Sequence, residues 1–143
     1  MGEILESMGK GKRPASFENK EGDIDLYKSS LEVSKCEVYN FEMEALIIGD
    51  GGSANVHYAK GKFSCSDHTY IFKNTSPRCA LKYIYLVLYH HLELLEVGFN
   101  GISIKNIAKS FIDNIKSPSS PFLSESRLWQ NVAPLRSAIK RCV

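Results

Sequence analysis

Three side chains of the kinds that bind metals or attack electrophiles lie close together in this 143-residue chain: His57, Cys65 and His68. A zinc site needs about four ligands in tetrahedral geometry, and this stretch offers three. A cysteine nucleophile needs a base oriented beside it, and either histidine is near enough in sequence to serve. The surrounding residues match neither arrangement. We therefore expect no catalytic residue, no metal and no other cofactor.

Basic side chains beside glycines suit a different chemistry, the binding of phosphate. The segment GKGKR (residues 9–13) carries three cations on a backbone that glycine makes flexible, and Gly61 is flanked by two more. Cations of this kind are common phosphate contacts. A solvated basic loop is the alternative for any run this short. The predicted phosphate contacts are Lys10, Lys12, Arg13, Lys60 and Lys62.

A glycine pair interrupts the segment IIGDGGSANVHY (residues 47–58). Gly51 and Gly52 follow an apolar run and precede an alternating one, without the spacing of a P-loop or of GxGxxG. Glycine here either supplies a positive φ in a tight connection or lets the backbone pass close to a ligand. The sequence leaves both interpretations open.

The residues around these candidates predict a sheet. The apolar run at 46–48, within the segment 38–50, is typical of a buried strand. Residues 55–66 alternate on either side of Lys60-Gly61, which predicts a hairpin with its turn at that dipeptide. The segment 68–72 predicts a further strand of the same sheet.

The clearest helix is predicted over residues 76–98. Ser76 is a good N-cap, Pro77 suits the first turn, and Gly98 suits the C-terminal end. One face carries leucine and other apolar side chains at helical spacing: Leu81, Ile84, Tyr85, Leu88, Leu92 and Leu95. His90, His91, Glu93 and Glu96 fall opposite that face, which predicts a solvated surface. A second, shorter helix is predicted over 103–111.

Composition and charge narrow the class of protein. Apolar residues make up 43% of the chain, and no run is long enough to span a membrane. The four widely spaced cysteines predict free thiols in a reducing compartment, so we expect a cytoplasmic protein. Residues 1–50 carry 6 basic and 11 acidic groups, whereas residues 51–143 carry 12 and 5. The basic second part is compatible with a surface that faces a polyanion.

The order of these segments resembles a target recognition domain from the DNA specificity subunit of type I restriction–modification systems. The resemblance covers roughly residues 1–135. It rests on GEILESMGKGKRP, EGDIDLYKSS and ALIIGDGGSANVHYAKGKFSCSDHTYIF, on the long Leu/Tyr helix, and on NGISIKNIAKSFIDNIKSP. In the last segment the spacing is N-I-x-K-x-x-I-x-x-I-x-x-P, from Asn106 to Pro118.

The resemblance implies an α/β (α+β) fold: a single domain with a twisted, mostly antiparallel or mixed sheet and one long and one short helix packed on it. It implies a recognition domain over residues 1–121 and a truncated helix of the conserved region over 122–143, interrupted by Pro134. The glycine loop would link strands near the DNA-facing side, where Gly51 and Gly52 serve close packing and backbone contact. The predicted base-reading side chains are Asn19, Lys20, Ser53 and Asn55.

The function implied is non-catalytic recognition of a short half-site in double-stranded DNA, with methyltransferase and endonuclease subunits as partners. The apolar positions of the tail predict that it packs on such a subunit or on a second copy, as a homodimer. The acidic first third and the short final helix favour an alternative, a degenerate scaffold or protein-interaction domain that no longer reads DNA. A small hydrolase built on Cys65 is the weakest of the three hypotheses.

Overall fold

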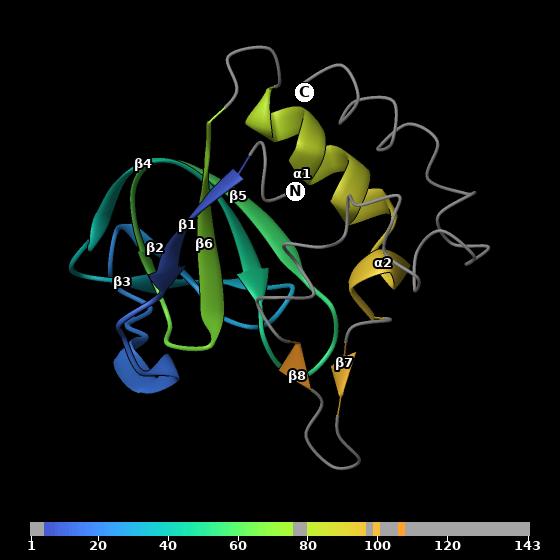
Figure 1. Ribbon diagram of the computed structural model, residues 1–143. Helices are drawn as coiled ribbons and strands as arrows, with labels where there is room; N and C mark the ends of the chain where they lie inside the picture. The colour runs from blue at the N-terminus through green and yellow to red at the C-terminus, as the bar shows by residue number, and fades with distance from the viewer. Residues whose placement is uncertain (1–4, 76–79, 97–98, 101–105, 108–143) are drawn as a thin grey trace, which may run out of the picture.

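The computed structural model describes residues 5–75, 80–96, 99–100 and 106–107. Six strands form the main sheet: β1 (Leu5–Lys10), β2 (Ile24–Tyr27), β3 (Val33–Cys36), β4 (Phe41–Gly49), β5 (Val56–Cys65) and β6 (Thr69–Asn74). The helical elements are η1 (Ala15–Phe17), α1 (Leu81–His90) and α2 (Glu93–Glu96). Two short strands, β7 (Phe99–Asn100) and β8 (Asn106–Ile107), pair with each other (Figure 1).

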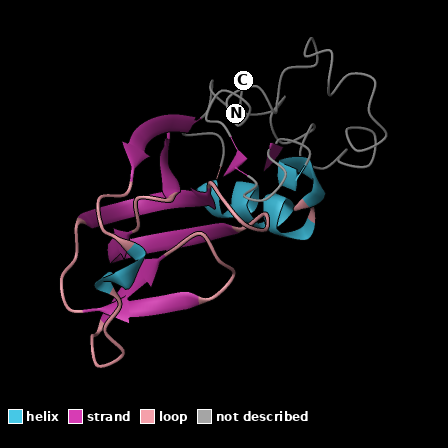
Figure 2. Cartoon of the chain, turned by 90° about the horizontal axis from the view of Figure 1, so that it is seen from below, coloured by secondary structure: helices cyan, strands magenta, loops and turns pink. Residues whose placement is uncertain are grey.

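The main sheet is mixed, with strand order β1-β6-β4-β5-β2-β3. The β2–β5 pair is parallel and the other four pairs are antiparallel. One side of the sheet bends strongly, whereas other strands run nearly straight (Figure 2). Past the end of β5, Ser66 forms a parallel bridge with Arg13, and its backbone N–H donates to the carbonyl of Tyr27. The segment after β1 therefore lies beside the end of β5, and the sheet curls back on itself.

The core is built around β4, which is buried on both faces from Ala45 to its end. Side chains alternate across a strand, so Ala45 and Ile47 share one face and Leu46 and Ile48 the other. The first face joins the cluster inside the curled sheet, with Tyr27, Ala59, Phe63, Cys65 and Ile71. α1 packs on β4 and β5 and covers the outer face (Figure 1). The predicted buried strand is confirmed and is longer than the apolar run that marks it.

The predicted hairpin over 55–66 is wrong. β5 runs without a turn from Val56 to Cys65, and its register with β4 is continuous through Lys60 and Gly61. Gly61 has a φ of 96°, yet it still pairs opposite Met43. The nine residues of β4 give this segment a partner along nearly its whole length, so ladder pairing with β4 outweighs the local turn signal. The strand predicted at 68–72 is present as β6.

The long helix is shorter than its pattern predicts. α1 begins at Leu81, with Ala80 in an extended conformation at its N-cap position. The predicted cap Ser76 lies outside the described residues. It ends at His90, and α2 follows as a separate helical turn. Leu81, Ile84 and Leu88 of the predicted apolar face are buried, together with Val87. Gly98 lies outside the described residues.

The second helix predicted over 103–111 is wrong at Asn106–Ile107, which form β8. The rest of that segment and residues 122–143 lie outside the described residues. A single domain of α/β type, with one mixed six-stranded sheet and a helix packed on it, is confirmed. Within the described part of the chain, no helix is long and apolar enough to cross a membrane.

Candidate nucleic-acid interface

Four connecting segments meet at one end of the curled sheet, which we call the loop end: residues 11–17, 28–30, 50–55 and 66–68. Backbone hydrogen bonds hold three of them in place, and the Ser29 hydroxyl joins segment 28–30 to Gly51. The N–H of Gly11 donates to Thr69 (3.0 Å), that of Asp67 to Arg13 (2.8 Å), and that of Asp50 to His68 (2.9 Å). An open pocket of about 420 Å³ lies between them, lined by Ala15, Lys28, Ser29, Ser30, Gly51, Gly52, Ser66 and His68.

The glycine loop is held in place by a serine from the turn after β2. The Ser29 hydroxyl donates to the carbonyl of Gly51 (2.6 Å) and accepts from the N–H of Gly51 (3.0 Å). Gly52 has a φ of 74°, a conformation that favours glycine. A Cβ added at Gly52 would approach only the Ser29 carbonyl oxygen, at 4.0 Å. The backbone at Gly52 is therefore open toward the pocket, and both interpretations of the glycine pair fit this loop.

The four predicted base-reading side chains are placed differently. Ser53 and Lys20 are exposed, and Ser53 is part of the loop end. Asn55 is 1% exposed and its amide donates to the carbonyl of Ser53 (2.8 Å), so it shapes the loop from within. Asn19 accepts from the N–H of Glu21 (3.0 Å) and donates to the Glu37 carboxylate (2.7 Å), which makes it a turn residue.

The cations of the GKGKR segment lie at the loop end with distinct partners. Lys10 forms an ion pair with Asp50, and this hydrogen bond is the largest cause of the raised pKa of Lys10. Asp50 is 5% exposed, and its second oxygen lies 3.3 Å from Nδ1 of His68. Arg13 donates to Asn40 (3.0 Å), and its guanidinium lies over the ring of Phe17 at 4.3 Å.

Lys12 is exposed and projects from the same loop. Its neighbour Gly11 is buried, and a Cβ there would collide with the carbonyl oxygens of Cys65 and Ser66. Glycine at this position is thus required by close packing rather than by flexibility. The segment holds Lys12 on a fixed backbone at the rim of the loop end.

Sequence reasoning missed Lys28, which lines the pocket. Its ammonium lies 2.6 Å from the carboxylate of Glu18, and the lysine side chain is 23% exposed. The available signal was the run Lys28-Ser29-Ser30 directly after an apolar pair, which places polar side chains where a strand ends.

Lys60 and Lys62 are separated from the GKGKR cations. Both are exposed on β5, directly opposite Glu44 and Glu42 of β4. Lys62 also lies over the ring of Tyr39 at 4.9 Å. On this part of the sheet each predicted phosphate contact faces an acidic neighbour.

The metal and nucleophile hypotheses fail on geometry. His57 bonds the carbonyl of Ser30, and His68 bonds Asp50. Cys65 is fully buried, and that burial raises its pKa to about 12, so the thiolate needed for attack is disfavoured. No three His, Cys, Asp or Glu residues in the described part of the chain are grouped to hold a metal ion.

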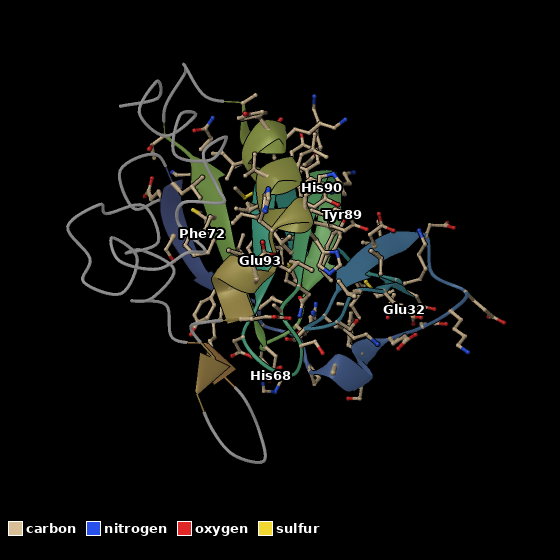
Figure 3. The ribbon with its side chains drawn as sticks, turned by 90° about the vertical axis from the view of Figure 1, so that its right-hand side faces the viewer. Glu32, His68, Phe72, Tyr89, His90 and Glu93 are labelled. Carbon is tan, nitrogen blue, oxygen red and sulfur yellow. The ribbon has the colours of Figure 1, made fainter. Side chains whose placement is uncertain are left out.

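Figure 3 shows His68 at the end of the molecule where η1 lies, and Tyr89 and His90 on α1 away from it. The loop end and the outer face of α1 are therefore separate surfaces. The loop end combines cations, hydroxyls and an open glycine backbone, which together suit contact with a phosphodiester backbone.

Comparisons with known proteins identify the family of this chain. The family model described as type I restriction modification DNA specificity domain matches residues 1–122. Among solved structures, the fold is similar to the S subunit of a type-I restriction-modification system from M. genitalium, with a TM-score of 0.67 and 19% identity. That match covers 78% of this chain and 31% of the S subunit, so the chain spans about a third of that protein. No curated protein matches. The chain belongs to the family of type I restriction–modification DNA specificity domains.

Proposed function

We propose that this chain is a non-catalytic, sequence-specific DNA-binding module that recognises a half-site in double-stranded DNA. The observation that carries the proposal is the family match over residues 1–122. By analogy with the S subunit whose fold it shares, the module directs methyltransferase and endonuclease subunits to that half-site. Any modification or cleavage of DNA then belongs to those partners.

The loop end is the surface we assign to DNA. Lys12 and Arg13 contact backbone phosphates there, since both lie on a loop fixed by Gly11 and by bonds to the 66–68 turn. Phosphate contacts of this kind position a protein on the duplex without reading its sequence. Lys60 and Lys62 attract phosphate less strongly than two isolated lysines would, because Glu44 and Glu42 lie opposite them.

Base readout is assigned to exposed polar side chains that a loop carries into a groove. Ser53 fits because it is exposed on the glycine loop, and Lys20 fits because it is exposed beyond η1. Asn55 and Asn19 act indirectly, by holding the glycine loop and the turn before β2 in shape.

The test is binding of the purified chain, with and without partner subunits, to a library of duplexes about 30 base pairs long. At about 50 mM salt we expect binding to mixed duplex DNA, with affinity that falls steeply as salt rises. Lys12→Ala should weaken binding to every sequence by a similar factor and reduce the salt slope by about 0.9. Absence of binding at this salt, with partners supplied, contradicts the proposal.

The alternative is an interaction domain that no longer reads DNA. The ion pairs Lys10–Asp50 and Lys28–Glu18 favour it, because they neutralise cations at the surface where DNA would lie. The same library separates the two functions: a scaffold binds partner subunits but selects no duplex.

A further inference from the structure

We propose that the pocket at the loop end is a phosphate site of the DNA interface, with Lys28 as its cation and Glu18 as an internal competitor for that cation. Glu18 holds Lys28 when DNA is absent and gives it up when a backbone phosphate enters the pocket. Glu18 therefore limits affinity for DNA. This inference rests on the proposed function and adds a site to it.

The pocket has the chemistry of an anion site. Its lining combines the Lys28 side chain and the 65% exposed imidazole of His68 with the backbone of Gly51 and Gly52. Ser29 and Ser30 also line it, and their hydroxyls donate to the carbonyls of Gly51 and Glu32. A volume of about 420 Å³ is ample for a phosphodiester group with part of its sugar. None of the described residues that line it carries a carboxylate. The nearest carboxylates are those of Glu18 beside Lys28 and of Asp50 and Asp67 beside His68.

Lys28 is held differently from the other ion-paired lysines. Its side chain is 23% exposed, whereas Lys10, Lys35 and Lys73 are 44%, 48% and 41% exposed in their own ion pairs. An ammonium that is partly withdrawn from water is stabilised by an anionic partner beside it. Glu18 supplies that partner from the turn that follows η1, at 2.6 Å.

Glu18 is a partner that can leave. Its side chain is 34% exposed, and the hydrogen bond from Lys28 is the largest cause of the lowered pKa of this carboxyl. A carboxylate at the surface regains water when its lysine turns to a phosphate. Asp50 cannot do the same, because its side chain is 7% exposed and is bound by both Lys10 and His68. The competitor is therefore Glu18, and the Lys10–Asp50 pair stays intact.

The experiment measures duplex affinity and salt slope for Lys28→Gln and Glu18→Gln in the full chain, with its partner subunits if the wild type requires them. Lys28→Gln should weaken binding about tenfold for all sequences and reduce the salt slope by about 0.9. Glu18→Gln should strengthen binding about two- to fivefold, because phosphate no longer displaces a carboxylate. Lys73→Gln and Glu6→Gln are matched controls, since they alter an exposed ion pair on β1 and β6.

Three results would overturn the inference while leaving the proposed function in place. The first is wild-type DNA binding that Glu18→Gln leaves unchanged or weakens. The second is an effect of Lys28→Gln no larger than that of Lys73→Gln. The third is an NMR titration in which inorganic phosphate shifts the pocket residues while DNA affinity is insensitive to Lys28, which would assign the pocket to free phosphate. If the wild type binds no DNA at all, in contrast, the proposed function itself is refuted.

Lys28→Gln is checked for folding by its thermal unfolding transition. If that variant is unfolded, Lys28→Arg and Lys28→Met are compared instead. Affinity that is retained in Lys28→Arg and lost in Lys28→Met shows that the positive charge is required. Glu18→Gln is an exposed, nearly isosteric change, so its gain in affinity can be measured in either case.

Discussion

The imidazole of His57 donates through Nε2 to the carbonyl oxygen of Ser30 at 2.6 Å, which ties β5 to the turn that lines the pocket. His57 is 7% exposed and packs against the ring of Tyr27 at 5.2 Å. Burial is the main cause of its lowered pKa, and the bond to Ser30 opposes that shift in part. A neutral histidine thus supports the loop end from inside the sheet.

Acidification should destabilise the protein through His57. Because the folded-state pKa lies below the unfolded value of about 6.5, the unfolded chain binds more protons, and stability falls as pH drops through 6.5 toward the folded pKa. The slope is at most about 1.4 kcal/mol per pH unit. Denaturant unfolding of wild type and His57→Gln between pH 5.5 and 8 measures it. The variant should show a weaker pH dependence. Equal slopes for wild type and His57→Gln would refute this role.

Gly11→Ala should destabilise the fold by about 1–3 kcal/mol, because the new methyl group meets the backbone carbonyls of Cys65 and Ser66. Backbone cannot move aside as a side-chain end can. The free energy of unfolding from denaturant titration is the measurement. Lys12→Ala, one position later and exposed, should change it by less than about 0.5 kcal/mol. Equal stability of the two variants would mean that the segment after β1 does not pack against β5 as described.

Leu88→Ala should cost about 2–5 kcal/mol, since this side chain is fully buried between α1 and the outer face of the sheet. Leu86→Ala makes the same chemical change two residues earlier, at a position that is 41% exposed. Thermal and denaturant unfolding of both variants should separate them clearly. Similar losses would contradict the orientation of α1.

Cys65 should resist thiol reagents at pH 8 in the folded protein, because burial raises its pKa to about 12 and removes access. A variant with Cys79→Ser and Cys142→Ser keeps only Cys36 and Cys65, both buried and free. Mass spectrometry after iodoacetamide treatment should find little label until guanidinium unfolds the chain. Rapid labelling of Cys65 in the native state would revive the hydrolase hypothesis.

The elements with strong periodicity could be predicted from the sequence, and those set by long-range pairing could not. Leu46–Ile48 and the Leu81/Ile84/Leu88 face are buried as their patterns predict, because burial follows directly from apolar spacing. Gly61 carries a local turn signal, but its pairing with Met43 depends on β4 lying alongside.

The same limit applies to the candidate site. The basic character of GKGKR is visible in the sequence, but the Lys10–Asp50 partnership spans forty residues and exists only in the folded chain. The sequence predicts that Asn55 is an exposed polar residue of a loop. In the structure it is buried, and its amide bonds Ser29 and Ser53. The role of Lys28 could not be predicted, because no neighbouring residue in the sequence shows that the strand before it ends at a pocket.

The pairing of β1 with β6 has a consequence for the order of assembly. Leu5 pairs with Asn74 and Lys10 with Tyr70, so β1 finds its sheet partner in β6, the strand of the main sheet that is synthesised last. Contacts between such distant residues form late and slow the folding of a chain. During synthesis the GKGKR segment cannot take up its place beside β5 until the 66–68 turn has also emerged. If synthesis stopped before β6, the GKGKR segment would already be present, but β6, against which β1 pairs, would be missing.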